Sequence, residues 1–377
     1  MNIHSLPTPA LLLDEEILEQ NLRRMQEKAN AFSVKLRPHI KTHKCIEIGK
    51  KQVALGAKGI TVSTLYEAME FSKAGFNDIT WAFPIPPIYA TQAAALAEKI
   101  ALRVVIDSHE AIGLLEKAAR AGGKKTHVWL KIDCGYHRAG VDPKSALAED
   151  LIKSLSESTS IEFNGILSHS GHSYAGKNRA EIKKAADEER TVMVEFAERM
   201  RAKRYNIPAV SIGSTPAMSV IEDLKGISEV RPGNYAFNDY TQAITNVCDV
   251  GNCAVTVLAS VISHQPGAKH FVTDAGALAL SKDLGPTHVA NDMEMGPIFE
   301  DYDRKRLASH IQLKALSQEH GKVVTEDAKH LEGKFHVGDR VRILENHSCL
   351  TVFNFDKYYV VKGDEVVAEW KILRGRN

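Results

Sequence analysis

The sequence predicts a parallel (β/α)8 barrel, of the TIM-barrel type, followed by a mostly β domain. Between residues 34 and 230, eight short apolar runs alternate with helical patterns, which is the chain order of a barrel built from βα units. After about residue 245, strand-like runs are separated by Gly, Asp and Asn turns instead of helices. A length of 377 residues also favours two domains over a single core.

The first element is a short strand that ends before Asp14, a residue suited to cap a helix. Leu18, Leu22 and Met25 then recur at helical spacing. The eight barrel strands are expected at Val34–Leu36, Gly59–Ser63, Ile79–Phe83, Arg103–Ile106, His127–Ile132, Phe163–Ser168, Ala209–Ile212 and Ser228–Val230. An open doubly wound sheet is the alternative, but no G-x-G-x-x-G follows the first of these strands.

The second domain is read as β structure from its alternating runs. Its strands are expected at Ala254–Ile262, His270–Thr273, Val341–Leu344, Tyr358–Val361 and Val366–Trp370. The predicted domains are residues 14–245 for the barrel and 246–377 for the β domain. We expect the strand within residues 1–13 to pair with the second domain.

Composition excludes several functional classes. The formal net charge is +1, so nothing favours binding to nucleic acid or to an anionic membrane surface. No run of 18 apolar residues predicts a transmembrane span, and no secretory signal pattern is visible at Met1–Pro7. Five sparse cysteines fit reduced thiols better than a disulfide framework, and a cytoplasmic location is therefore expected.

Polar residues and glycines follow the C-terminal ends of the predicted barrel strands, where barrel enzymes keep their active sites. A lysine in this position can form an imine with an aldehyde cofactor, and the loops after the seventh and eighth strands are the usual phosphate site. Singly, these residues are more often part of a surface ion pair, a turn or the core. The positions after the strands hold His39, Lys41, His43, Asp133, His137, Arg138, His169, His172, Tyr174, Gly213, Ser214, Thr215, Arg231, Gly233, Asn234 and Tyr235, and their shared placement predicts a pyridoxal phosphate site with Lys41 opposite a phosphate cradle.

A second constellation, His347-Ser348-Cys349, lies near the end of the chain. On an extended segment, His347 and Cys349 would point to one face and could share a zinc ion. A buried cysteine beside a hydrogen-bonded histidine is the structural alternative. Cys248 and Cys253 have a spacing close to metal-site patterns, but we interpret them as structural.

Five motifs resemble, in order, the D-serine dehydratase and D-threonine aldolase family of alanine-racemase-like (fold type III) pyridoxal phosphate enzymes. They are Pro38–Lys44, Lys131–Gly140, Ser211–Pro216, Arg231–Tyr235 and Asn346–Cys349. The resemblance implies a barrel, a C-terminal β domain and a head-to-tail homodimer. It also implies that Lys41 holds the cofactor as an imine, and that Arg138 lies near the ring oxygen and Arg231 near the pyridine nitrogen. Ser214, Thr215, Gly233 and Asn234 match the phosphate site, and His347 and Cys349 match a metal pair for Zn²⁺, with Mn²⁺ or another divalent metal as the alternative.

The resemblance implies a metal-dependent lyase acting on D-3-hydroxy amino acids such as D-serine, D-threonine or 3-hydroxy-D-aspartate. Cys349 favours dehydration to a keto acid and ammonia. His172 favours the alternative, cleavage of the Cα–Cβ bond to glycine and an aldehyde, because that reaction needs a base for the β-hydroxyl. Amino acid racemization and non-catalytic cofactor binding are further alternatives. The metal pair argues against the first of these, and the β domain argues against the second.

Overall fold

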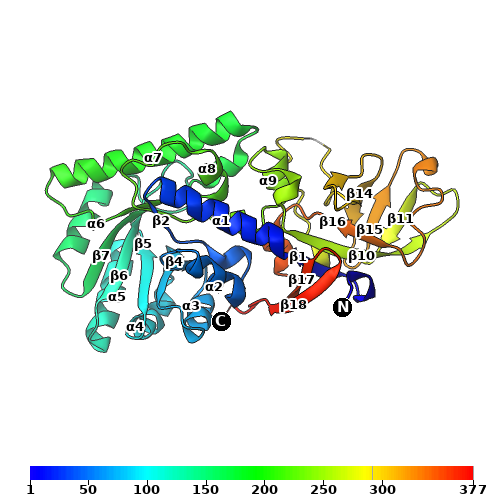
Figure 1. Ribbon diagram of the computed structural model, residues 1–377. Coiled ribbons are helices and arrows are strands. Elements are labelled where there is room, and N and C mark those ends of the chain that lie inside the picture. Colours follow the sequence, from blue (N-terminus) through cyan, green and yellow to red (C-terminus); the bar gives the residue numbers. More distant parts are fainter. Residues whose placement is uncertain (291, 377) are drawn as a thin grey trace. The chain divides into compact units, whose positions relative to one another are not determined.

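The computed structural model describes residues 1–290 and 292–376, and the chain forms two units (Figure 1). Residues 24–233, together with the last residues from Gly375, form the barrel unit. Residues 1–23 and 234–374 form the β unit. The chain therefore starts in the β unit, builds the barrel, and then returns to the β unit.

The barrel unit contains a sheet of eight parallel strands, as predicted. They are β2 (Lys35–Leu36), β3 (Ile60–Val62), β4 (Asp78–Pro84), β5 (Ala101–Ile106), β6 (Thr126–Lys131), β7 (Ile161–Leu167), β8 (Val210–Ile212) and β9 (Glu229–Val230). Their order is β2-β9-β8-β7-β6-β5-β4-β3. The amide of Lys58 donates to Leu36 O and that of Thr61 to Pro38 O, at 2.9 and 2.8 Å. These bonds join the segments of β2 and β3, which stand at the two ends of this order, and so close the barrel.

Helices alternate with the strands around the barrel, as Figure 1 shows in blue to green. They are α1 (Glu15–Ala31), whose first half lies in the β unit, α2 (Ile46–Ala54), α3 (Leu65–Lys73), α4 (Ala90–Ala97), α5 (His109–Gly122), α6 (Ala146–Glu157), α7 (Arg179–Ala202) and α8 (Thr215–Val220). In α6 the buried residues Ala148, Leu151, Ile152 and Leu155 follow one helical stripe, so apolar burial fixes the helix against the sheet.

A group of paired charges joins four of the barrel strands through Arg37 after β2, Glu229 on β9, Asp78 on β4 and Arg103 on β5, with Arg37 and Glu229 buried and the other two half-buried. Nε of Arg37 donates to Glu229 at 2.7 Å, and its other nitrogens bind Asp78. Arg103 also binds Asp78. Each charge is thereby paired, which a buried ion requires.

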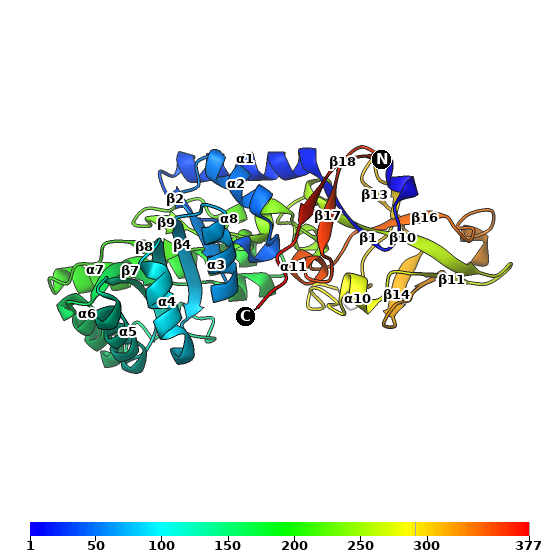
Figure 2. The same ribbon diagram turned by 90° about the horizontal axis from the view of Figure 1, so that it is seen from below.

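The β unit is built on a second eight-stranded sheet, seen from below in Figure 2. Its strands are β1 (Ala10–Asp14), β10 (Val255–His264), β11 (His270–Thr273), β14 (Gln312–Leu316), β15 (Gly321–Val324), β16 (Arg340–Ile343), β17 (Lys357–Lys362) and β18 (Glu365–Lys371). A separate pair consists of β12 (Phe299–Asp301) and β13 (Arg306–Leu307), and the unit's short helices are α9 (Tyr240–Ile244), α10 (Ala277–Leu280) and α11 (Ser348–Val352).

Strand β1 lies in the middle of this sheet, antiparallel to β10 and parallel to β17. Asp14, which ends β1, accepts a hydrogen bond from the amide of Ile17 and so caps α1 as predicted. The five strands predicted after residue 245 are present, whereas β12 to β15 were not predicted. Within the part of the chain that the structure describes, no helix is long and apolar enough to cross a membrane.

Candidate active site

Lys41 lies on a one-turn 3-10 helix, Ile40–Thr42, directly after β2. Its backbone amide donates to Nδ1 of His39 at 3.4 Å, while Ile40 and Thr42 are buried and anchor the turn. The side chain of Lys41 is exposed. Burial and then the charge of Lys41 hold the pKa values of His39 and His169 well below the usual range. The charge of Lys41 therefore acts on imidazoles that follow two different barrel strands, β2 and β7.

The loop after β9 approaches this turn closely at Gly233. A Cβ atom on Gly233 would lie 2.7 Å from the carbonyl oxygen of His39, closer than real Cβ atoms approach. Only glycine lets the two backbones meet here. The contact brings the loop after the last barrel strand against the segment that carries Lys41.

The loops after β7 and β8 are joined through several hydrogen bonds. Nδ1 of His169 donates to Gly213 O at 3.2 Å. The hydroxyls of Ser173 and Ser214 lie 2.8 Å apart, and Ser214 caps α8 by accepting from the amide of Ala217 at 3.3 Å. Ser214 and Thr215 are both buried. Ser214 and Thr215 therefore belong to a pair of loops that hydrogen bonds join together.

Two buried basic residues, Arg231 and Lys131, lie at the same ends of the strands. Arg231 donates to the hydroxyl of Ser211 and to the carbonyl oxygen of Ser168. Burial lowers the pKa of Arg231 to about 10, although the charges of Glu229 and Glu189 act in the opposite direction. Burial, followed by the charge of Arg231, lowers the pKa of Lys131 to about 7.

The loop after β6 and the loop after β7 meet through aromatic rings. The guanidinium of Arg138, which is exposed, lies 4.9 Å from the centre of the Tyr136 ring. That ring is 6.3 Å from the ring of His169 and 6.2 Å from that of His172. Nδ1 of His172 is buried without a hydrogen-bond partner in the described residues, and Tyr174 is half-buried two residues later.

These residues fit pyridoxal phosphate. They combine an amine on Lys41, buried hydroxyls on Ser214 and Thr215 that suit a phosphate, and basic side chains that suit the negative charge of the whole cofactor. Gly233 provides the close backbone approach that such a cradle needs. After burial, the charges of Lys41, Lys131 and Arg138 lower the pKa of His169. The charges of Arg231 and Arg138 likewise lower the pKa of Lys131.

Asn234 and Tyr235 follow Gly233 but belong to the β unit. The side-chain amide of Asn234 donates to Asp239 at 2.7 Å and to the hydroxyl of Ser348 at 2.9 Å. Tyr235 is buried. The predicted phosphate residue Asn234 thus holds the residue between His347 and Cys349.

The prediction that His347 and Cys349 lie on an extended segment is wrong. His347 has an extended backbone but is the N-cap of α11, and Cys349 lies within that helix. The amide and the hydroxyl of Ser348 donate to Asp239 at 3.1 and 3.3 Å. Asp239 therefore turns the chain into a helix directly after His347.

The two side chains nevertheless meet. Nδ1 of His347 donates to Asp283 at 2.8 Å. Burial lowers the pKa of His347, but hydrogen bonds to Asp283 and Cys349 outweigh it and raise the pKa to about 11. A thiol and an imidazole in contact suit a soft divalent metal. Among residues 1–290 and 292–376, no group of three or more His, Cys, Asp or Glu side chains could hold a metal ion, so the pair remains the candidate.

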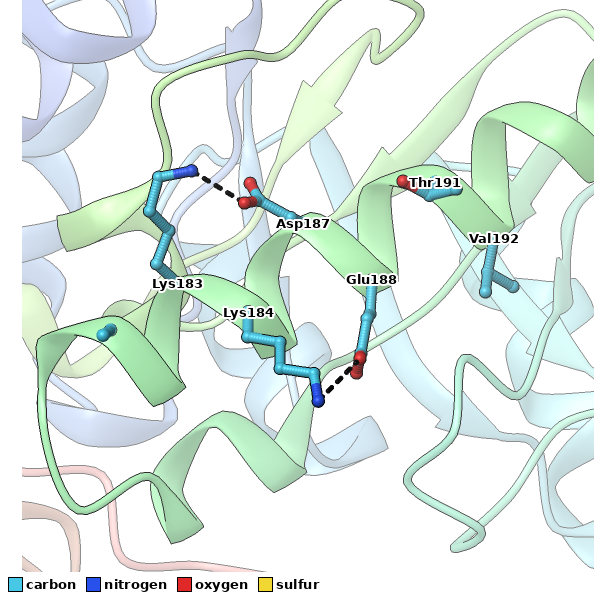
Figure 3. Close-up of a pocket in the computed structure, with 7 residues that line it drawn as sticks. Lys183, Lys184, Asp187, Glu188, Thr191 and Val192 are labelled. Atoms are coloured by element: carbon cyan, nitrogen blue, oxygen red, sulfur yellow. Dashed lines mark hydrogen bonds and ion pairs between the residues drawn. The ribbon is translucent and has the colours of Figure 1, made fainter.

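Sequence reasoning missed Asp239, Asp283 and Glu189. Only Glu189 left a clear signal, because it interrupts the apolar stripe of α7 formed by residues such as Ile182, Ala186 and Met193. Figure 3 shows a hollow on the outer face of the same helix, where Lys183 pairs with Asp187 and Lys184 with Glu188. No predicted site residue lines that hollow.

Comparison with known proteins agrees with the sequence motifs. Residues 13–241 match the family described as alanine racemase, N-terminal domain, and residues 254–361 match that described as putative serine dehydratase domain. The chain belongs to the D-serine dehydratase and D-threonine aldolase family of alanine-racemase-like enzymes. The predicted family and enzyme class, a pyridoxal phosphate-dependent lyase, are confirmed.

The chain is 36% identical to D-serine dehydratase from Dictyostelium discoideum, over 97% of this chain and 96% of the relative. It is 34% identical to D-threo-3-hydroxyaspartate dehydratase from Delftia sp. HT23, whose structure matches with a TM-score of 0.92 over 99% of each chain. Two variants of a D-threo-3-hydroxyaspartate dehydratase also match at 34% identity and a TM-score of 0.91. In the first, which is described as metal-free, alanine replaces a cysteine, and the match covers 100% of both chains. In the second, alanine replaces a histidine two positions before that cysteine, and the match covers 100% of this chain and 97% of the variant. D-threonine aldolase from Filomicrobium marinum matches at 26% identity and a TM-score of 0.86, over 98% of this chain and 96% of the aldolase.

Proposed function

We propose that the protein removes water from a D-3-hydroxy amino acid, such as D-serine or D-threo-3-hydroxyaspartate, and that the resulting enamine, after tautomerising to an imine, takes up one water molecule and is hydrolysed to a keto acid and ammonia. The observation that carries this proposal is the contact between His347 and Cys349, with Asp283 on Nδ1 of the imidazole. Elimination of a hydroxyl group is difficult without a Lewis acid, and this pair supplies ligands for one. The dehydratases among the relatives, at 36% and 34% identity, add support.

Lys41 would hold pyridoxal phosphate covalently, with its phosphate against Ser214, Thr215 and Gly233. When bound, the cofactor accepts electron density from the bond broken at Cα of the amino acid. Arg231 would face the ring nitrogen and Arg138 the ring oxygen. His169, Tyr174 and Tyr235 complete the proposed cofactor set, and Asn234 would contribute through its position directly after Gly233.

Lys41 has two roles in this proposal. Its Nζ first binds the cofactor and then, when the substrate amine has taken that place, removes the proton from Cα. A base held beside the reacting atom gains much of its effect from proximity. The cationic residues around it attract the substrate carboxylate.

We propose that the metal ion is zinc, held by Nε2 of His347 and Sγ of Cys349. Thiolate and imidazole are preferred zinc ligands, whereas manganese prefers oxygen. A histidine and a cysteine with the same spacing were replaced in the two matched dehydratase variants, and the cysteine variant is described as metal-free. The metal would polarise the β-hydroxyl and assist its departure. Metal analysis of active protein should return zinc in stoichiometric amount, and activity restored by manganese alone would overturn this assignment.

Aldol cleavage is the second candidate, and His172 favours it. Its Nδ1 is buried without a hydrogen-bond partner in the described residues, as expected for a base that accepts a proton from the hydroxyl of a bound substrate. Product analysis with D-threonine separates the reactions. Dehydration yields 2-oxobutanoate and ammonia, whereas cleavage yields glycine and acetaldehyde. The appearance of L-allo-threonine alone, the product of inversion at Cα, would indicate a racemase instead.

The cofactor assignment is tested by absorption spectroscopy. Protein loaded with pyridoxal phosphate should show the visible band of a lysine-bound cofactor, and Lys41→Ala should lose that band together with activity. Lys50→Ala, which changes an exposed lysine on α2, is the control and should retain both. Bound cofactor without turnover of any D-amino acid would favour the non-catalytic alternative.

We further propose a homodimer in the cytoplasm. Resemblance to the alanine-racemase-like enzymes supports the dimer. The five free cysteines suit a reducing compartment. Light scattering of the purified protein and cell fractionation test the two statements separately.

A further inference from the structure

Three consecutive acidic residues on α7 have very different surroundings. Asp187 and Glu188 lie on the outer face of the helix, where Lys183 and Lys184 pair with them (Figure 3). The next residue, Glu189, is completely buried, at 0% exposure. A carboxylate is rarely buried unless hydrogen bonds or ion pairs compensate the lost hydration. The groups that Glu189 contacts therefore indicate which part of the structure it stabilises.

Glu189 accepts hydrogen bonds from two different loops. Oε1 accepts from the hydroxyl of Ser168 at 2.7 Å and from the amide of Gly213 at 3.4 Å. Oε2 accepts from the hydroxyl of Ser170 at 2.6 Å. Ser168 and Ser170 follow β7, whereas Gly213 follows β8. A single buried side chain therefore ties together the ends of two neighbouring barrel strands.

These bonds continue to the predicted phosphate residue Ser214. The hydroxyl of Ser170 lies 3.5 Å from that of Ser214, and the hydroxyl of Ser173 lies 2.8 Å from it. Ser173 in turn donates to Ser170 O at 2.7 Å. Displacement of Ser170 would therefore alter the direction in which Ser214 presents its hydroxyl.

We propose that Glu189 is a positioning residue that holds the loops after β7 and β8 in the shape that receives the phosphate group of pyridoxal phosphate. The inference rests on the proposed function, because it assumes that Ser214 and Thr215 bind that phosphate. Glu189 acts through Ser170 and Gly213 and need not touch the cofactor.

The test compares two cofactors that differ only in the phosphate. Apoprotein is titrated with pyridoxal phosphate and with pyridoxal, and binding is followed by the absorption of the lysine-bound form. In Glu189→Gln, affinity for pyridoxal phosphate should fall on the order of tenfold while affinity for pyridoxal changes little, since charged hydrogen bonds at the phosphate loops are weakened. Glu188→Gln, the neighbouring change on the outer face, should leave both affinities unchanged.

A purely structural role for Glu189 predicts a different result. Loosening of the whole barrel would lower both affinities together and leave their ratio unchanged, which would overturn the inference. If Glu189→Gln does not fold, Ser170→Ala decides the matter, because it removes one of the transmitting hydroxyls and should lower the same ratio. Failure of wild-type protein to bind either compound would instead contradict the cofactor site itself.

Discussion

Asp283 holds Nδ1 of His347 at a distance of 2.8 Å. The loop that carries Asp283 is itself fixed by Asn346, whose side-chain amide donates to Asp283 O at 3.0 Å and to Glu294 O at 2.7 Å. The residue before the candidate ligand thus anchors the loop that orients it. A carboxylate on one imidazole nitrogen fixes the ring so that Nε2 can face a metal.

Replacement of Asp283 by asparagine should weaken metal binding by about 10- to 100-fold, the usual effect of removing such a partner. Competition with a chromogenic chelator measures this affinity without reference to turnover. Asp339→Asn, which breaks an exposed histidine–aspartate pair with His336, is the control and should have no effect. Equal metal affinity of Asp283→Asn and wild type would contradict the role of Asp283.

Replacement of Gly233 by alanine should lower stability by about 1–3 kcal/mol, because the new Cβ would press on the carbonyl oxygen of His39. Cofactor affinity should fall as well, since the segment that carries Lys41 must shift. Gly113→Ala is the matched control. Gly113 is an exposed helical glycine with no atoms near its Cβ direction, so this change should stabilise by about 0.5–1 kcal/mol. Chemical denaturation of both variants measures the difference.

Glu229→Gln should destabilise the barrel by about 3 kcal/mol, because it leaves the buried guanidinium of Arg37 with only one of its two carboxylate partners. The same residue also accepts from the hydroxyl of Ser211 at 2.8 Å. Glu195→Gln on the exposed face of α7 should change stability by less than about 0.5 kcal/mol. Urea denaturation measures the free energy of unfolding of both variants. An equal decrease in the two would show that the buried pair of Arg37 and Glu229 does not stabilise the barrel more than an exposed glutamate does.

Lys131 should make the stability of the apoprotein depend on pH. Burial and the charge of Arg231 lower its pKa from the usual 10.5 to about 7. Between these values the native lysine binds fewer protons than the unfolded one, so its contribution makes stability rise with pH across this interval, by at most about 1.4 kcal/mol per unit. Below pH 7 the full penalty remains. Lys131→Met should remove this slope, which unfolding experiments at pH 7, 8 and 9 would detect. Identical slopes would show that Lys131 is not buried as a neutral amine.

The barrel could be predicted because many of its strands are largely buried and appear as mostly apolar runs even when short, as with β3 and β8, whose residues are all buried. Strands β14 and β15 escaped prediction because exposed residues such as Lys314 and Lys322 interrupt them. The helical position of Cys349 escaped for another reason. Asp239, which holds Ser348, lies far away in the chain, and no local pattern reports such a contact.

The same limit applies within the candidate site. The placement of Lys41, Ser214 and Gly233 follows from their positions after barrel strands, which the sequence reveals. The partnership of Asp283 with His347 depends on the path of a loop, which the sequence does not reveal. Glu189 lies between these cases, because its acid side chain within an apolar stripe could have been noticed.

The central place of β1 in its sheet has a consequence for how the protein is made. Leu12 pairs with Thr256 on one side and with Tyr359 on the other. The ribosome therefore synthesises residues 24–233 of the barrel before either β10 or β17 exists. Until then the backbone N–H and C=O groups of β1 have no partner strand on either side. A single cut in the gene cannot separate the two units, since a barrel expressed alone would have to lose residues from its beginning as well as its end.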